Sequence, residues 1–155
     1  MMSLGLAHTI LSILTIVLGL VVVAGVLRGK RLGFVTSLYF VSALATIITG
    51  FVFPGSFGIP KILGAIALAV VLAAIVARYA FALRGSWRAI YAFTAVLSVW
   101  SFTFFAVGEA FLRIPFLKEL APTLSELPFW IAEGVVFALF MVLAIMATNR
   151  FRAYI

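Results

Sequence analysis

The sequence predicts an all-α protein that crosses a lipid bilayer as a bundle of five transmembrane helices. Hydrophobic residues make up 66% of its 155 residues and charged residues only 10%, whereas ordinary soluble domains carry about a quarter charged residues. A soluble fold of this size could not hide so much apolar surface from water. The chain also contains five separate apolar runs, and each approaches the roughly 20 residues that a span requires.

Short polar breaks separate the five apolar runs. The first run ends at the basic turn 28–31, and the second ends at the proline- and glycine-rich stretch 54–60, a composition typical of turns. The turn 84–86 closes the third run, and Arg113-Ile114-Pro115 closes the fourth. The length leaves no room for a separate soluble module. We therefore predict one membrane domain, 1–155, with helices at 4–27, 34–53, 61–83, 87–112 and 129–148.

The connection 114–128 is the longest break in the chain. Its apolar residues predict that it lies along the membrane interface. Thr123 and Glu126 have the spacing of a capping box, which predicts Thr123 as the N-cap of the last helix, with Ser125 as an equal alternative. Pro128 fits only near the first turn of that helix, because a proline has no N–H to donate.

Charged residues sort by sign along the predicted topology. Five spans place the termini on opposite sides, and positive charge collects on the cytoplasmic side of membranes. The N-terminus is therefore expected outside and the C-terminus inside, with all four glutamates and the single histidine on the outer side. The inner bases are Arg28, Lys30, Arg31, Arg78, Arg84, Arg88, Arg150 and Arg152, and the outer bases are Lys61, Arg113 and Lys118. The net charge of +7 is then explained by topology and lipid contact rather than by nucleic acid.

An alanine series marks the third helix as a packing element. Small residues spaced by four allow two helices to approach closely in lipid. The partner could belong to the same chain or to a second copy, so a homo-oligomer is one prediction. The series consists of Ala65, Ala69, Ala73 and Ala77.

Hydroxyl side chains form stripes on three predicted helices. Steps of three and four place each set on one helix face, and polar groups avoid lipid, so these faces are expected to line the interior of the bundle. They could border a ligand cavity or polar path, but interhelical hydrogen bonds are the favoured interpretation. The lining residues are Ser12, Thr15, Ser42, Thr46, Thr49, Ser98 and Ser101.

Glu109 and Glu133 are the sharpest candidates for a binding site. Each lies just inside the outer end of a span, where a carboxylate is costly unless it is paired, hydrated or protonated. Arg113 follows Glu109 by four residues, so an ion pair on one helix face is expected. The structural interpretation is two interfacial carboxylates that hold the loop. The functional hypothesis is a proton- or cation-binding site shared with His8, formed where these groups converge.

The stretch 114–129 resembles a loop of a known group of proteins. Its Ala121-Pro122-Thr123-Leu124-Ser125-Glu126-Leu127-Pro128-Phe129 segment, and the tail 143–152, are similar to those of small uncharacterised bacterial integral membrane proteins. Members of that group carry an APTxSExPF-like loop before their last helix, and tend to have a glutamine early in that helix where this chain has Glu133. The resemblance implies a bacterial inner membrane and no specific activity.

Composition and spacing disfavour several kinds of site. The absence of cysteine excludes disulfides and thiolate metal ligands. A single histidine, with no aspartate in the chain, supports neither a metal motif nor a catalytic triad, so we expect no metal, cofactor or catalytic residues. The favoured function is a non-enzymatic binding, transport or accessory protein in the lipid bilayer, with no nucleic-acid partner. A structural or oligomeric subunit is the alternative, and an intramembrane enzyme acting on a lipophilic substrate comes third.

Overall fold

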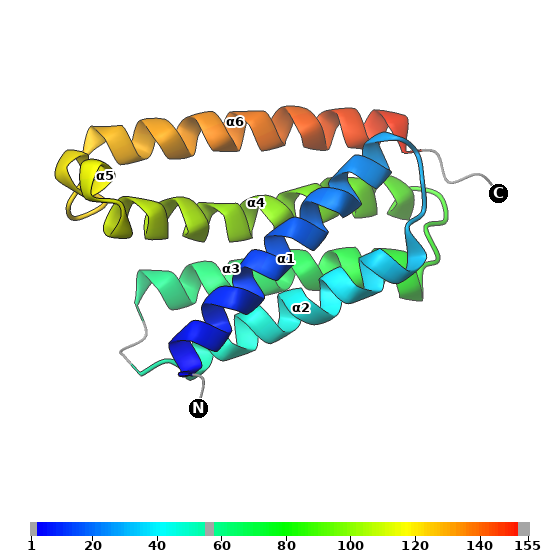
Figure 1. Ribbon diagram of the computed structural model, residues 1–155. Coiled ribbons are helices and arrows are strands. Elements are labelled where there is room, and N and C mark those ends of the chain that lie inside the picture. Colours follow the sequence, from blue (N-terminus) through cyan, green and yellow to red (C-terminus); the bar gives the residue numbers. More distant parts are fainter. Residues whose placement is uncertain (1–2, 55–57, 152–155) are drawn as a thin grey trace.

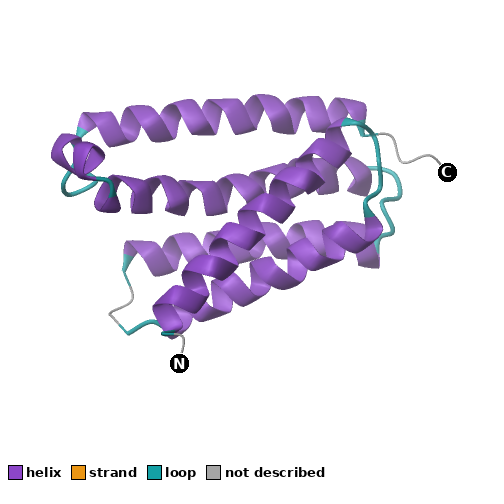
Figure 2. Cartoon of the chain, viewed as in Figure 1, coloured by secondary structure: helices purple, strands orange, loops and turns teal. Residues whose placement is uncertain are grey.

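The structure, a computed structural model, describes residues 3–54 and 58–151. Within these residues five long helices run back and forth as a bundle, which confirms the predicted fold class (Figure 1). The same part of the chain contains no strand, as the secondary-structure colours of Figure 2 show. The helices are α1 (Leu4–Leu27), α2 (Gly33–Val52), α3 (Ile59–Ile75) with its π-helical extension η1 (Val76–Ala80), α4 (Trp87–Arg113), the short α5 (Pro115–Leu120) and α6 (Leu127–Arg150).

Helix α1 crosses the bundle obliquely and contacts α2, α4 and α6. It lies beside α2 near its own start and approaches α6 near its own end (Figure 1). Between these points it packs on α4, which also contacts α3 and α6. Helix α4 is therefore the central element, and five other elements contact it: α1, α3, η1, α5 and α6.

The alternating helices give the bundle two chemically different ends. The carboxylate end contains the start of α1, the α2–α3 connection, the end of α4, α5 and the start of α6. The basic end contains the turns 28–32 and 81–86 and the end of α6. The carboxylate end holds Glu109, Glu119, Glu126 and Glu133, and the basic end holds Arg28, Lys30, Arg31, Arg78, Arg84, Arg88 and Arg150. Arg152 and residues 55–57 of the predicted turn lie outside the described residues.

Prolines and one hydroxyl side chain mark where helices begin. The Ser3 side chain accepts a 3.2 Å hydrogen bond from the Leu6 N–H at the start of α1. Pro60, Pro115 and Pro128 occupy the first two positions of α3, α5 and α6. The missing proline N–H has no intrahelical partner at such positions, so the residue starts a helix without breaking one.

The third helix differs from the predicted range 61–83. It begins at Ile59 and ends, through the π-helical turn, at Ala80. Ala82 and Leu83 then adopt left-handed backbone angles, with φ of 50° and 59°, which side chains bearing a Cβ adopt rarely. This reversal returns the Leu83 side chain to the core, where it is buried.

The connection before the last helix contains more structure than the sequence predicted. Residues Pro115–Leu120 form α5, and α6 begins at Leu127 with Glu126 as its N-cap. Neither Thr123 nor Ser125 is the N-cap, so both predicted caps are wrong in position. The reason is that the Glu126 carboxylate accepts hydrogen bonds from the Thr123 hydroxyl (2.7 Å) and the Ser125 N–H (3.1 Å), which closes a turn before the helix starts.

The outer surface of the long helices is apolar. Ile13, Val41, Ile48 and Val135 are each more than half exposed, and all five long helices have the length and composition to cross a bilayer. Exposed branched side chains on this scale are stable against lipid tails and unfavourable in water. The structure thus describes a multi-pass membrane protein.

The alanine series of the third helix does not share one face. Ala65 and Ala69 are exposed, Ala73 is half-buried and Ala77 is completely buried. A spacing of four advances by 400° around a helix of 3.6 residues per turn, so the series rotates by about 40° at each step. Only its last member is fully buried inside the chain, and contact with a second copy through the outer members stays a prediction.

Candidate functional site

Two polar contacts join α1 to α2 along the predicted hydroxyl stripes. His8 Nδ1 lies 2.7 Å from Thr49 Oγ1, and Thr15 Oγ1 lies 2.9 Å from Thr46 Oγ1. The hydroxyl protons of Thr49 and Thr15 are directed to carbonyl oxygens of their own helices. His8 Nδ1 therefore donates to Thr49, and the Thr46 hydroxyl donates to Thr15. Hydrogen bonds of this kind contribute about 0.6 kcal/mol each in membrane helices.

A third polar contact joins α2 to the central helix. The Tyr39 hydroxyl lies 2.6 Å from Ser98 Oγ, and the Ser98 hydroxyl donates to the Ala95 carbonyl, so Tyr39 is the donor of the interhelical bond. Both side chains are completely buried. The remaining predicted lining residues, Ser12, Ser42 and Ser101, donate to carbonyl oxygens of their own helices.

Glu109 forms the ion pair that its spacing predicts. Arg113 Nε lies 2.6 Å from Glu109 Oε2, and both side chains are more than half exposed. An exposed pair on one helix face contributes little to stability, because water screens both charges. Glu109 also interacts electrostatically with His8. No hydrogen bond or ion pair of the described residues connects Glu133 to His8, Glu109 or Arg113.

Glu133 occupies a different environment from Glu109. Only 4% of its surface is exposed, and neither carboxyl oxygen has a hydrogen-bond partner among the described residues. It is the seventh residue of α6. The free backbone N–H groups of a helix lie in its first turn, so they are too far away to cap Glu133. Burial without a hydrogen-bond donor is costly for a carboxylate. Among the four glutamates, which are all described, only Glu133 is both buried and without a hydrogen-bond partner.

The surroundings of Glu133 are aromatic. Phe129 and Phe137, one turn away on either side, pack against the α4 residues Phe104 and Trp100, at 6.3 and 5.0 Å between ring centroids. Glu133 therefore faces α4 between two ring contacts. The Trp100 indole nitrogen on α4 is also buried without a hydrogen-bond partner in the described part of the chain. This helix pair thus holds one unsatisfied donor and one unsatisfied carboxyl group.

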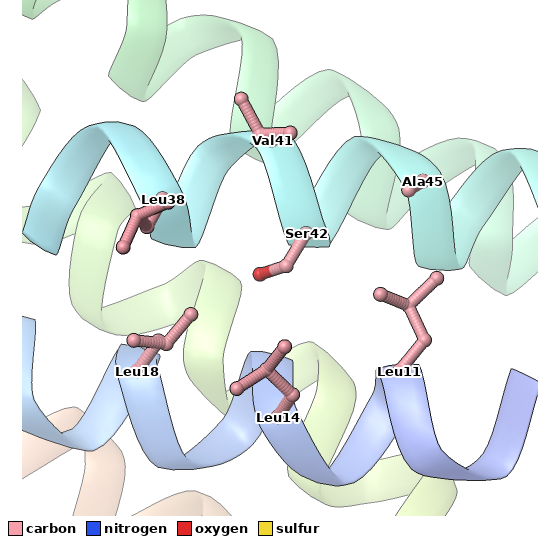
Figure 3. Close-up of a pocket in the computed structure, with 7 residues that line it drawn as sticks. All are labelled: Leu11, Leu14, Leu18, Leu38, Val41, Ser42 and Ala45. Carbon is pink, nitrogen blue, oxygen red and sulfur yellow. The ribbon is translucent and has the colours of Figure 1, made fainter.

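An apolar groove separates the opposing faces of α1 and α2. Figure 3 shows Ser42 directed between leucine side chains of α1, and the groove has a volume of about 290 Å³. The Ser42 hydroxyl already donates to the Tyr39 carbonyl at 2.9 Å, so the groove offers little polar recognition. It is suited to a hydrocarbon chain rather than to a polar ligand. Its lining residues are Leu11, Leu14, Leu18, Leu38, Val41, Ser42 and Ala45.

The geometry limits the chemistry of this site. Within residues 3–54 and 58–151, no three histidine or acidic side chains are grouped as metal ligands would be. The chain matches no protein-family model, no curated protein and no solved structure. The fold and the site together define a class, a multi-pass helical membrane protein with a buried carboxyl group near one end.

Sequence reasoning missed two parts of the functional geometry. Trp100 was not among the predicted site residues, because nothing in the sequence shows that its indole N–H lacks a partner. Arg78 was assigned only to membrane topology, although it falls inside a predicted span. An arginine within a span is by itself a reason to expect a functional site, so this signal was present in the sequence.

Proposed function

We propose that this protein is a non-enzymatic binding, transport or accessory protein of a bacterial inner membrane. Its N-terminus lies outside and its C-terminus in the cytoplasm, an orientation supported by the seven described bases of the basic end. The resemblance of the 121–129 segment to small bacterial membrane proteins supports the choice of membrane. The working part is the carboxylate end, and Glu133 is the group that takes a proton or a cation.

The buried, unpartnered carboxyl group of Glu133 carries this proposal. A carboxyl group between apolar helices requires a proton, a cation or a hydrogen-bond donor, and none of the described residues donates a hydrogen bond to Glu133. Exchange of the proton for a monovalent cation would keep this site neutral, whereas loss of the proton without a replacing cation would leave a buried negative charge. His8, Glu109 and Arg113 lie at the same end of the bundle as Glu133.

Labelling with a hydrophobic carbodiimide tests this assignment. The reagent partitions into the membrane and reacts with protonated carboxyl groups, so we expect a mass-spectrometric adduct on Glu133 in the reconstituted protein. Labelling should fall by about tenfold per pH unit above the pH at which the group ionises, because the reactive species is the protonated acid. A bound cation should also slow the reaction, and Na⁺, K⁺ and Mg²⁺ are the first to test.

Two glutamine variants serve as matched controls. Glu133→Gln should abolish the adduct, whereas Glu109→Gln should retain it, because Glu109 is exposed and paired. A labelling rate that does not change with pH or with any of the cations would contradict the proposal. That outcome would favour a purely structural bundle.

The alternative function is that of a structural or oligomeric subunit. The exposure of Ala65 and Ala69 favours it, because small residues on an outer helix face allow close helix contact in lipid. Under this alternative, Glu133→Gln would change stability and no other measured property.

A further inference from the structure

The basic end of the bundle contains a pocket that the proposed function does not use. It has a volume of about 180 Å³ and is formed by the turn before α2, the π-helical turn η1 and the reversal that follows it. Its lining residues are Arg31, Arg78, Tyr79, Ala82 and Leu83. Two arginine residues thus line one concave site at the end of the third long helix.

Arg78 is held in place by aromatic side chains. Its guanidinium carbon lies 5.7 Å from the centre of the Tyr79 ring and 5.4 Å from the centre of the Tyr91 ring. Its Nη1 donates a 3.2 Å hydrogen bond to the Tyr91 hydroxyl. A guanidinium group has five N–H donors in a fixed plane, so this single bond leaves several donors for an anion.

The backbone around the pocket is unusual. A π-helical turn often marks a functional site, and here Arg78 and Tyr79 both belong to this turn and line the pocket. The Tyr79 hydroxyl lies 2.8 Å from Ser37 Oγ on α2, which connects the turn to the neighbouring helix. Ala82 and Leu83 line the pocket with left-handed backbone angles, which carry a conformational cost.

Among the described residues, no acidic side chain balances the charge of the pocket. All four glutamate side chains lie at the opposite end, and Arg31 is exposed and forms no hydrogen bond or ion pair with the described residues. An arginine side chain can bind a phosphate group through two parallel N–H···O hydrogen bonds. Basic pockets between helices at a membrane surface suit anionic lipid headgroups.

We propose that the pocket formed by Arg31, Arg78 and Tyr79 binds the phosphate group of an anionic phospholipid. The two guanidinium groups contact the phosphate, the Tyr79 ring holds Arg78 in position, and the acyl chains lie along the apolar outer surface. The proposal does not depend on Glu133 or on the orientation of the protein, because it concerns only the basic end.

Native mass spectrometry of the full chain, released from nanodiscs, tests the site. Nanodiscs of phosphatidylcholine with added phosphatidylglycerol should yield protein that retains phosphatidylglycerol in preference to phosphatidylcholine. Arg31→Gln should reduce this retention by about tenfold, because a charge-assisted hydrogen bond is lost. Arg28→Gln is the matched control, since it removes an equal, exposed charge from the same turn but not from the pocket, and retention should stay within about twofold of the unmodified protein.

Further measurements distinguish a phospholipid headgroup from free inorganic phosphate as the ligand. Inorganic phosphate titrated into nanodiscs of phosphatidylcholine alone should not bind if the ligand is a lipid. Binding of inorganic phosphate that Arg31→Gln removes would keep the site but assign it to a soluble anion, which overturns the lipid assignment. Equal losses in Arg31→Gln and Arg28→Gln, or retention without preference for the anionic lipid, would overturn the site itself. Arg31 is the test residue because it is exposed, whereas variants of Arg78 disturb the tyrosine packing and can fail to fold.

Discussion

At the scale of single residues, Gly19 shows how closely the helices approach. A Cβ atom at this position would lie 2.7 Å from Val99 Cγ2 and 2.9 Å from Tyr39 Cε2, so a neighbouring side chain would have to move. Tyr39 cannot move freely, because its hydroxyl donates to Ser98 inside the core. The glycine is therefore required by packing and not by its backbone angles.

Gly19→Ala is expected to destabilise the protein by about 1–3 kcal/mol, the usual cost of overpacking a core. The measurement is the free energy of unfolding in mixed micelles. Gly134→Ala is the matched control, because a Cβ built there meets no side chain and no other element within 4 Å, and its stability should be unchanged or slightly higher. Equal effects of the two substitutions would show that α1 does not pack as closely as described.

The two glutamates show which residue-level features a sequence can reveal. The ion pair of Glu109 with Arg113 depends on a separation of four residues, and this spacing is visible in the chain. The isolation of Glu133 depends on which α4 side chains face it, so it becomes visible only when α4 and α6 are packed together. The sequence therefore identified both residues as candidates and could not separate their environments.

At the scale of elements, the segment 121–126 is a turn organised by one carboxylate. Hydrogen bonds, first from the Thr123 side chain and then from backbone N–H groups, lower the pKa of Glu126 below the ordinary glutamate value. A lowered pKa in the folded state means that the contribution of this carboxylate to stability is fully present above the ordinary value. The contribution is lost as the pH falls through the lowered pKa.

Amide chemical shifts provide the test of this turn. The Ser125 and Thr123 N–H resonances are expected to titrate together in NMR spectra, with a midpoint below the ordinary glutamate pKa, because both groups donate to Glu126. Glu126→Gln should remove the titration, whereas Glu119→Gln on α5 should leave it unchanged. A midpoint at or above the ordinary value would contradict the described hydrogen bonds.

Elements differed in how well the sequence predicted them. The start and end of α1 agree with the predicted range, because a long apolar run is bounded by polar turns on both sides. The helix α5 and the turn η1 were not predicted. Each is only five or six residues long, and no hydrophobic period can be recognised over so short a segment.

At the scale of the whole molecule, each long helix connects the two ends of the bundle, so these ends lie on opposite membrane faces. The chain lacks cysteine, so a single introduced cysteine provides a unique label. In bacterial cells, a membrane-impermeant maleimide is expected to label Ser125→Cys from outside and Ser86→Cys only after permeabilisation. Both serines are exposed in turns at opposite ends of the bundle. The reverse pattern would contradict the proposed orientation, and labelling of both positions from one side would show that α4, the long helix between them, does not cross the membrane.

The sequence by itself determined that the chain is a bundle of five apolar helices and that acids and most bases lie at opposite ends. These properties follow from local composition and from the alternating direction of successive spans. Only the tertiary structure decided that Glu133 is buried without a partner, that Tyr39 bonds to Ser98, and that Arg78 lies between two tyrosine rings. Such contacts depend on how each helix is rotated and tilted against its neighbours, and a pattern along one chain does not contain that geometry.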